Sequence, residues 1–235
     1  MSQKITKPKA VCLFSGGLDS ATVLYSAIRE GYEVTALTVH YGQKHERELA
    51  SARAILEPLG IKHHVISIEL PWGGSSLLDR RAAVPQGRAE EVMSSEIPST
   101  YVPARNTIFL SLAGSLAEVL EAEAIFIGAN AIDYSGYPDC RPEFLQAMAH
   151  VLERGTKAGV SGRRIRIEAP LVRLSKKTIT QLAHALQVPL EETWSCYLGG
   201  ERPCGTCDSC LLRKKGFEEA GFSDPALSYE VSSYR

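Results

Sequence analysis

Short apolar runs alternate along this chain with segments whose apolar residues recur at helical spacing. The apolar runs predict β-strands at residues 10–14, 34–39, 65–68, 124–128 and 164–169. Helical spacing predicts helices at residues 18–28, 49–59, 108–122 and 144–153, with Gly31 placed to end the first. Ser175 is placed to cap a further helix, which carries Ile179, Leu182, Ala183 and Leu186. The alternation predicts an α/β fold, a doubly wound parallel sheet with helices on both faces.

One long segment interrupts this pattern. Residues 71–100 have little periodicity, and Gly73, Gly74 and Gly87 supply points at which the backbone can bend. Loops of this length in compact domains are usually functional lids or disordered insertions. The sequence leaves both alternatives open.

Composition limits the class of protein. The 235 residues, 44% of them hydrophobic and 23% charged, suit one globular domain with room for a small appendage. A net charge of −1 gives no general signal for nucleic acid binding. No apolar run approaches the roughly 20 residues that span a bilayer, and the polar N-terminus lacks the apolar core of a secretory signal. We therefore predict a cytoplasmic protein with no nucleic acid or membrane partner.

Polar and glycine-rich segments follow three of the predicted strands. They are FSGGLDS at residues 14–20, HYGQ at residues 40–43 and GAN at residues 128–130. Ligands of doubly wound sheets bind beyond the carboxyl ends of the strands, where these segments lie. We expect the three segments to form one pocket, with His40 and Gln43 lining one side of it.

The FSGGLDS segment has the chemistry of an anion-binding loop. Gly16 and Gly17 allow backbone N–H groups to converge on an anion, while Ser15 and Ser20 add hydroxyl donors at the positive end of the next helix. Asp19 would repel bare phosphate, so its presence suits a Mg²⁺ ion that bridges it to a polyphosphate. Such a loop can hold the β,γ-pyrophosphate of ATP and leave the α-phosphorus open to attack, which transfers AMP. The simpler alternative is a serine-glycine turn that caps an ordinary helix.

The segment SGGLDS resembles the pyrophosphate loop (PP-loop) of the N-type ATP pyrophosphatase superfamily. The resemblance implies an adenine nucleotide alpha-hydrolase-like fold and adenylation of an acyl or imidoyl oxygen. It also implies that the loop and the first helical turns bind ATP, through Phe14, Ser15, Gly16, Gly17, Leu18, Asp19, Ser20, Ala21, Thr22, Val23 and Leu24.

Four of the six cysteines crowd near the C-terminus, at Cys196, Cys204, Cys207 and Cys210. Disulfides are rare in a reducing cytosol, and four thiolates at this spacing suit tetrahedral Zn²⁺. An iron–sulfur cluster is the alternative. A zinc ion with four cysteine ligands has no open position, so it would stabilise the C-terminal tail. We therefore divide the chain into an α/β domain at residues 1–190 and a zinc-binding segment at residues 191–235, packed on that domain.

Four further blocks resemble the 7-cyano-7-deazaguanine synthase family of the queuosine pathway. They are YVPARNT at residues 101–107, GANAIDYSGYPDCRPEF at residues 128–144, APLVRLSKKTI at residues 169–179, and the cysteine tail with TWSC. Ala104 departs from the pattern, because glycine is expected there in many relatives. The resemblance implies a homodimeric ligase that forms carbon–nitrogen bonds.

The resemblance also implies a reaction. The carboxylate of 7-carboxy-7-deazaguanine attacks the α-phosphorus of ATP, and ammonia then displaces AMP to give an amide. A second ATP adenylates the amide oxygen, and loss of AMP leaves the nitrile. One pocket can serve both halves because the attacking atom is each time an oxygen on the same carbon.

Residue roles follow from the matched motifs. Asp19, Ser20, Lys176 and Arg105 are the predicted catalytic residues, with Lys176 and Arg105 neutralising phosphate or carboxylate charge. The predicted substrate contacts offer stacking faces and hydrogen-bonding groups to a flat purine-like base: Asn106, Asp133, Tyr134, Tyr137, Asp139 and Arg141. The alternatives are solvated lysines at positions 176 and 177, a surface arginine at position 105, and an aromatic-packed loop or subunit contact around Tyr137.

Three alternative functions make different demands on the sequence. A PP-loop enzyme that adenylates a tRNA base for thiolation would need a basic surface and a spare reactive cysteine pair. A glutamine-dependent amidotransferase subunit would need a glutaminase domain, so free ammonia is the simpler donor. A non-catalytic nucleotide-binding module would bind ATP without turnover.

Overall fold

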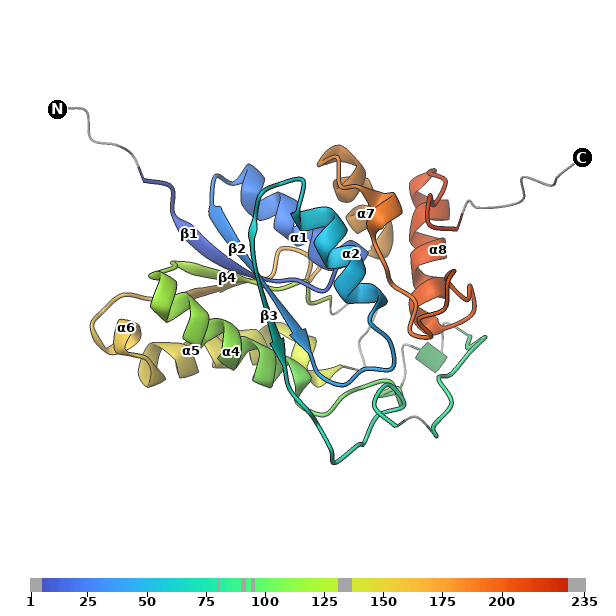
Figure 1. Ribbon diagram of the computed structural model, residues 1–235, viewed down its shortest axis with the longest axis horizontal. Helices are drawn as coiled ribbons and strands as arrows, with labels where there is room; N and C mark the ends of the chain where they lie inside the picture. Colours follow the sequence, from blue (N-terminus) through green and yellow to red (C-terminus); the bar gives the residue numbers. More distant parts are fainter. Residues whose placement is uncertain (1–5, 80, 90–91, 94–95, 131–136, 228–235) are drawn as a thin grey trace, which may run out of the picture.

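The computed structural model describes residues 6–79, 81–89, 92–93, 96–130 and 137–227. Its centre is a five-stranded sheet in the order β3-β2-β1-β4-β5, and every neighbouring pair is parallel (Figure 1). The strands are β1 Lys9–Leu13, β2 Glu33–His40, β3 Lys62–Ser67, β4 Ala124–Phe126 and β5 Arg166–Glu168. The order reverses between β1 and β4, so the predicted doubly wound sheet is confirmed.

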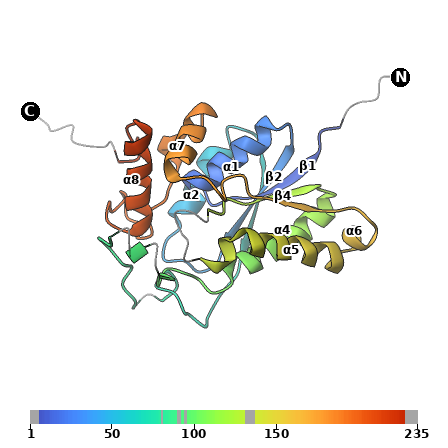
Figure 2. The same cartoon turned by 180° about the vertical axis from the view of Figure 1, so that it is seen from behind.

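Helices cover both faces of the sheet, as Figures 1 and 2 show from opposite sides. One face carries α1 Leu18–Arg29, α2 Arg47–Leu56 and α7 Lys176–Ala185, and α8 Asp208–Ala220 packs against α7. The other face carries α4 Arg105–Leu120, α5 Pro142–Gly155 and α6 Lys157–Val160. Two short 3-10 helices, η1 Pro138–Cys140 and η2 Leu190–Glu192, connect these elements.

The central strand β1 shows why the sheet is buried on both sides. Ala10 and Cys12 point into the core under α1, α2 and α7, whereas Val11 and Leu13 point into the core under α4 and α5. All four side chains are at most 7% exposed. A parallel strand covered on both faces has no polar side, which explains the continuous apolar run in the sequence.

Most predicted elements lie within a few residues of the observed ones. The predicted signals at two helix ends are also confirmed, because Ser175 Oγ accepts a hydrogen bond from Thr178 N and Gly31 has a φ of 92°. Helix α8 was not predicted. Its buried face includes the polar Asp208 and Arg213 and the small Gly216, so it lacks a clear apolar stripe.

The C-terminal segment shares a core with the α/β domain. Phe217 of α8 is 1% exposed and packs in the same cluster as Ile179 and Ala183 of α7. A Cβ atom added at Gly216 would lie 2.5 Å from Lys176 Cγ, so α8 lies directly behind that lysine. The division of the chain at residue 190 remains a prediction, but residues on its two sides pack against each other.

The segment between β3 and α4 packs against the cysteine-rich segment, by which we mean residues 194–213. Leu77 and Val84 are buried in one cluster with Cys196 and Cys207. Gln86 pairs with Cys207 in an antiparallel bridge, and Gly87 N donates a hydrogen bond of 2.8 Å to the carbonyl oxygen of Thr206. These described residues of the 71–100 segment therefore pack against the rest of the protein.

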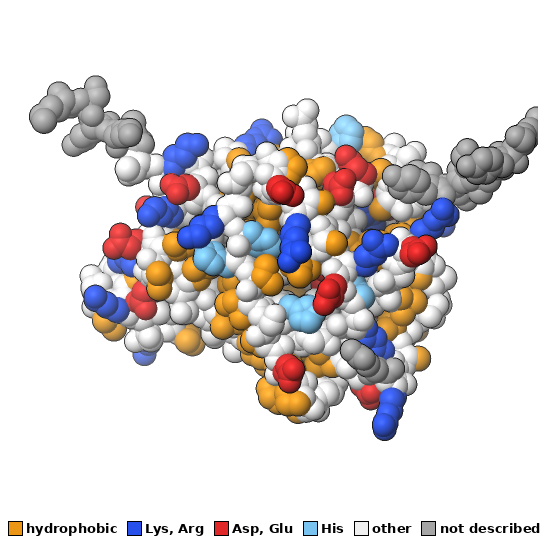
Figure 3. Space-filling model, in the orientation of Figure 1, with side chains coloured by type: hydrophobic (Ala, Val, Ile, Leu, Met, Phe, Trp, Pro, Cys, Tyr) orange, Lys and Arg blue, Asp and Glu red, His pale blue; other side chains and the backbone are white. Residues whose placement is uncertain are grey.

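On the face of the molecule that Figure 3 displays, basic and acidic side chains are interspersed, so neither sign of charge dominates that face. This agrees with the net charge of −1. Among the described residues, none of the helices has both the length and the apolar content needed to cross a membrane.

Ala104, the residue that departs from the family pattern, adopts a left-handed conformation. It precedes α4 with φ 54° and ψ 25°. A left-handed backbone costs a residue with a Cβ about 1–2 kcal/mol, and the entropy of glycine in the unfolded chain offsets about 0.4–1 kcal/mol of any gain. We expect Ala104→Gly to raise the free energy of unfolding by about 0.5–1 kcal/mol in urea denaturation.

The matched control for this change is Ala50→Gly, at an exposed position within α2. Glycine in a helix interior lowers stability by about 1 kcal/mol. A higher free energy of unfolding for Ala104→Gly and a lower one for Ala50→Gly would support the conformational explanation. A lower free energy of unfolding for both variants would refute it.

Candidate active site

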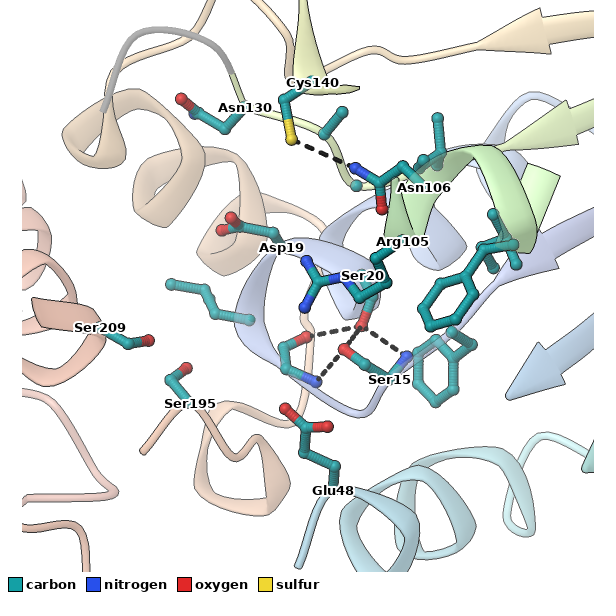
Figure 4. A pocket seen from close by; sticks show the side chains of 18 of the residues that line it. Ser15, Asp19, Ser20, Glu48, Arg105, Asn106, Asn130, Cys140, Ser195 and Ser209 are labelled. Carbon is teal, nitrogen blue, oxygen red and sulfur yellow. Dashed lines mark hydrogen bonds between the residues drawn. The ribbon is translucent and has the colours of Figure 1, made fainter. Parts of the chain in front are cut away.

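A pocket opens at the carboxyl edge of the sheet, between the loops that follow β1, β2 and β4 (Figure 4). Helices α2, α4, α7 and α8 complete its walls. The predicted convergence of the three loops is therefore confirmed. Gln43 lines the pocket, and its side chain accepts a hydrogen bond of 2.9 Å from Tyr41 N. His40 is not among the lining residues.

The PP-loop is packed so tightly that glycine is required in it. A Cβ atom at Gly16 would lie 2.6 Å from the backbone of both Glu48 and Ala52, and the φ of Gly16 is 81°. The hydroxyl groups of Ser15 and Ser20 lie 3.1 Å apart. Since α1 begins at Leu18, its positive N-terminal end points into the pocket with these hydroxyls. This arrangement can bind a polyphosphate.

Asp19 and Lys176 form an ion pair across the pocket. Lys176 Nζ lies 2.8 and 2.9 Å from the two carboxylate oxygens of Asp19. Lys176 is 8% exposed, so the alternative of a solvated lysine is wrong for position 176, whereas Lys177 is exposed. The pair places one cation and one carboxylate beside the PP-loop, where a metal–nucleotide complex needs both.

Arg105 lies over an aromatic wall of the same pocket. Its Nη1 donates to the hydroxyl of Tyr41 at 3.3 Å, and its guanidinium lies 5.7 Å from the ring centre of Tyr41 and 5.9 Å from that of Phe109. The arginine therefore faces the cavity and is no ordinary surface residue. Its position suits an anionic group of a ligand.

Glu48, which the sequence analysis did not select, lines the pocket next to Arg105. Burial raises the pKa of its carboxyl group to about 7, although Arg105 and a hydrogen bond with Gln43 act in the opposite direction. In the sequence Glu48 is one charged residue of an amphipathic helix. No local signal distinguishes it from its exposed neighbour Glu46.

Of the predicted substrate contacts that the structure describes, two line the pocket and two do not. Asn106 and Tyr137 line the pocket, and the Tyr137 hydroxyl is 2.8 Å from Thr100 Oγ1. Asp139 does not line it, because its carboxylate accepts a hydrogen bond of 2.9 Å from Asn106 N at the start of α4. Arg141 is exposed, precedes α5 and also lies outside the lining. Asp133 and Tyr134 lie outside the described residues.

The predicted nucleotide-binding residues likewise divide into two groups. Phe14, Ser15, Gly17, Leu18, Asp19 and Ser20 line the pocket. Gly16 and the residues from Ala21 to Leu24 do not. Thr22 shows why, since it is fully buried and its hydroxyl donates to the carbonyl oxygen of Leu18 at 2.7 Å. The residues from Ala21 to Leu24 are buried in α1 and support the PP-loop by packing in the core.

The cysteine-rich segment supplies a wall that the sequence analysis missed. Trp194 N donates a hydrogen bond of 3.0 Å to the carbonyl oxygen of Gly16, and Ser195 and Ser209 line the pocket. Arg213 is 4% exposed and pairs with both carboxylate oxygens of Asp224, at 2.7 and 2.9 Å. Its Nη1 also donates to Thr193 Oγ1 at 2.8 Å, which fixes the wall against α8.

The four cysteines form a cluster that could hold a metal ion. The sulfur atoms of Cys196, Cys204, Cys207 and Cys210 all lie within 4.8 Å of one another. Backbone N–H groups point at two of the sulfurs, from Leu198 and Cys204 at Cys196 and from Thr206 and Cys207 at Cys204. Such hydrogen bonds favour the thiolate form that binds a metal. The donors therefore fit a tetrahedral ion.

Comparison with known proteins decides the family. A family model described as "Queuosine biosynthesis protein QueC" matches residues 9–221. The chain belongs to the QueC family. A 7-cyano-7-deazaguanine synthase of Trichodesmium erythraeum is 54% identical over 221 residues, which cover 93% of this chain and all of the relative. One of Anaeromyxobacter sp. is 53% identical over 231 residues, covering 97% of this chain and 98% of the relative.

The fold of this QueC family member is found in other proteins as well. A solved complex of a 4-thiouridine synthetase with RNA and bound ATP aligns with a TM-score of 0.50 and 18% identity, covering 91% of this chain and 50% of that one. At that identity the likeness concerns the fold alone. The resemblance drawn from SGGLDS and the four further blocks is thus confirmed at the level of the family.

Proposed function

We propose that this chain is an ATP-dependent ligase that converts 7-carboxy-7-deazaguanine and ammonia to 7-cyano-7-deazaguanine, with release of AMP and pyrophosphate. Relatives named 7-cyano-7-deazaguanine synthase that are 53–54% identical over nearly their whole length support this substrate. The observation that carries the chemistry is the SGGLDS loop with the Asp19–Lys176 pair beside it.

The loop holds the leaving group in this proposal. The β,γ-pyrophosphate of ATP lies against the hydroxyls of Ser15 and Ser20 and the N-terminus of α1. Asp19 would supply a carboxylate ligand for the Mg²⁺ that accompanies ATP, and Lys176 would then pair with phosphate oxygens in place of Asp19. The bound Mg²⁺ would offset charge that develops on the pyrophosphate. The α-phosphorus then faces the middle of the pocket.

The substrate occupies the other side of the pocket. Arg105 binds the carboxylate or the α-phosphate, and Asn106 and Tyr137 contact the deazaguanine ring. The acid oxygen and later the amide oxygen attack the same phosphorus from the same carbon. One fixed set of residues can therefore serve both adenylation steps by holding the oxygen in line.

The cysteine cluster binds one zinc ion in this proposal. A Zn–S distance of about 2.3 Å places four tetrahedral sulfurs about 3.8 Å apart, and the sulfurs of Cys204 and Cys210 are 3.9 Å apart. Iron–sulfur clusters spread their thiolates over several irons and so separate them further. A zinc ion with four thiolate ligands has no open position, so it stabilises the wall at residues 194–213 and takes no part in the reaction.

The alternative of tRNA thiolation is not favoured, because relatives at 53–54% identity are named for the nitrile-forming reaction. The homodimer and the cytoplasmic location implied by the resemblance stay predictions.

The proposal is tested with α-³²P-labelled ATP, Mg²⁺, ammonia and 7-carboxy-7-deazaguanine, with the organic products identified by mass spectrometry. We expect labelled AMP, unlabelled pyrophosphate and the nitrile. Release of the amide alone would limit the enzyme to one adenylation, and formation of ADP with orthophosphate would exclude the proposed chemistry.

A further inference from the structure

Both halves of the proposed reaction release protons from nitrogen. When ammonia attacks the acyl-adenylate, a C–N bond forms and the C–O bond to AMP breaks with its electron pair on the phosphate oxygen. The new nitrogen carries a surplus proton. In the second half the adenylated amide loses its remaining N–H protons, as the last N–H electron pair becomes a π bond of the nitrile and AMP departs. A base within the pocket would serve each of these steps.

Few groups in the pocket can accept a proton near neutral pH. Lys176 and Arg105 have cationic side chains, and in the proposed complex Asp19 would be a ligand of the Mg²⁺ that accompanies ATP. Burial raises the pKa of Tyr41 and Tyr137, and it raises the pKa of Cys140 to about 11. No histidine is among the described residues that line the pocket. Of these lining residues, Glu48 is the carboxylate that remains.

The placement of Glu48 suits such a proton acceptor. Its side chain points from α2 into the pocket, on the side of the PP-loop (Figure 4). Its backbone packs under Gly16, so α2 holds it at a fixed distance from the loop. The Glu48 carboxyl interacts with Arg105, which the proposed function places at the carboxylate or α-phosphate, so Glu48 lies near the reacting group.

We propose that Glu48 is the general base that takes the proton from nitrogen in the amide-forming and nitrile-forming steps. This inference rests on the proposed function. Each proton moves from nitrogen to a carboxylate oxygen of Glu48 and is then released to water, so the residue is regenerated between steps. Its neighbours suit this exchange, since burial raises the pKa while Arg105 on α4 limits the rise, and the Tyr41 hydroxyl after β2 is the other titratable group that interacts with it.

The test uses Glu48→Gln, which keeps the size of the side chain and removes the base. Isotope exchange between pyrophosphate and ATP, dependent on 7-carboxy-7-deazaguanine, measures the first adenylation by itself. We expect this exchange to stay within about threefold of the unchanged protein, while formation of amide and nitrile from ammonia falls about 10²- to 10⁴-fold. Hydroxylamine, a less basic nucleophile that is unprotonated at neutral pH, should still trap the acyl-adenylate as a hydroxamate.

The pH profile supplies a second readout. At a constant concentration of unprotonated ammonia, the rate of amide formation should fall as the pH drops through about 7, since Glu48 becomes protonated. In Glu48→Gln this fall in rate at low pH should disappear. The matched control is Glu46→Gln, an exposed glutamate before the same helix, which should keep both activities and the pH profile.

The outcomes separate clearly. Amide formation by Glu48→Gln at the unchanged rate overturns the proposal, as does loss of pyrophosphate exchange in parallel with loss of amide, because Glu48 would then serve adenylation. Failure of the unchanged protein to catalyse any carboxylate-dependent exchange refutes the proposed function itself.

Discussion

Asp19→Asn is expected to lower AMP formation by about 10²- to 10³-fold, the usual effect of removing one group that stabilises developing charge. The amide keeps the shape of the side chain but carries no charge, so it is a poor ligand for the metal ion that accompanies ATP. The change also leaves the ammonium group of Lys176 without the carboxylate that lies 2.8 Å away. We expect both ATP binding and turnover to suffer, measured as labelled AMP per enzyme and by titration of Mg²⁺·ATP.

The fold of Asp19→Asn should persist, because Asp19 is partly exposed and the loop is held by Gly16 and Trp194. A matched control is Glu218→Gln, which breaks an exposed ion pair with Lys214 on α8. Exposed pairs contribute about 0–1 kcal/mol, so this variant should retain its activity. Full AMP formation by Asp19→Asn would show that the PP-loop is not the nucleotide site.

Removal of the metal proposed for the cysteine cluster is expected to weaken both the fold and ATP binding. Structural zinc sites contribute on the order of 10 kcal/mol to small domains that depend on them, and a part of that should be lost here because α8 also packs on α7. Chelation or Cys207→Ser should therefore lower the melting temperature by more than about 5 °C, the effect of about 2 kcal/mol in a domain of this size. Calorimetry and metal analysis measure the two quantities.

The effect on ATP follows from the contact between Trp194 N and the carbonyl oxygen of Gly16. Loss of one such hydrogen bond and its wall is worth about 1–1.5 kcal/mol, or about tenfold in ATP affinity. Cys12→Ala is the matched control, since Cys12 is buried in β1 and lies outside the cluster. It should keep a full complement of metal and normal ATP affinity. Metal-free protein with an unchanged melting temperature would contradict a structural role.

The regular part of the fold could be predicted because its signals are local. The apolar run at β1 reports burial on both faces, and Gly31 and Ser175 mark helix ends through their own conformation or side chain. Helix α8 could not be predicted from apolar residues at helical spacing, because its buried side includes Asp208 and Arg213. Those residues are polar partners of Arg88 and Asp224, so their burial depends on contacts that no helical pattern contains.

Site residues could be predicted where a sequence motif fixes the shape of the backbone. They could not be predicted where tertiary packing determines which side chains reach the pocket. Ser15, Asp19 and Ser20 belong to a loop whose sequence specifies its shape, and they line the pocket as expected. Asp139 instead binds the backbone N–H of Asn106, 33 residues away, which its chemistry permits but its position in the sequence does not reveal. Glu48 reaches the pocket because Gly16 allows α2 to approach the loop, a tertiary condition without a sequence signature.

The wall formed by residues 194–213 has a consequence for the order in which the protein matures. A growing chain could complete all five strands and the PP-loop while the partner of Gly16 and the cysteine cluster were still to be translated. Such an intermediate would hold ATP in an incomplete site. Productive consumption of ATP should therefore begin only after residues 194–213 have been synthesised and have packed against the loop.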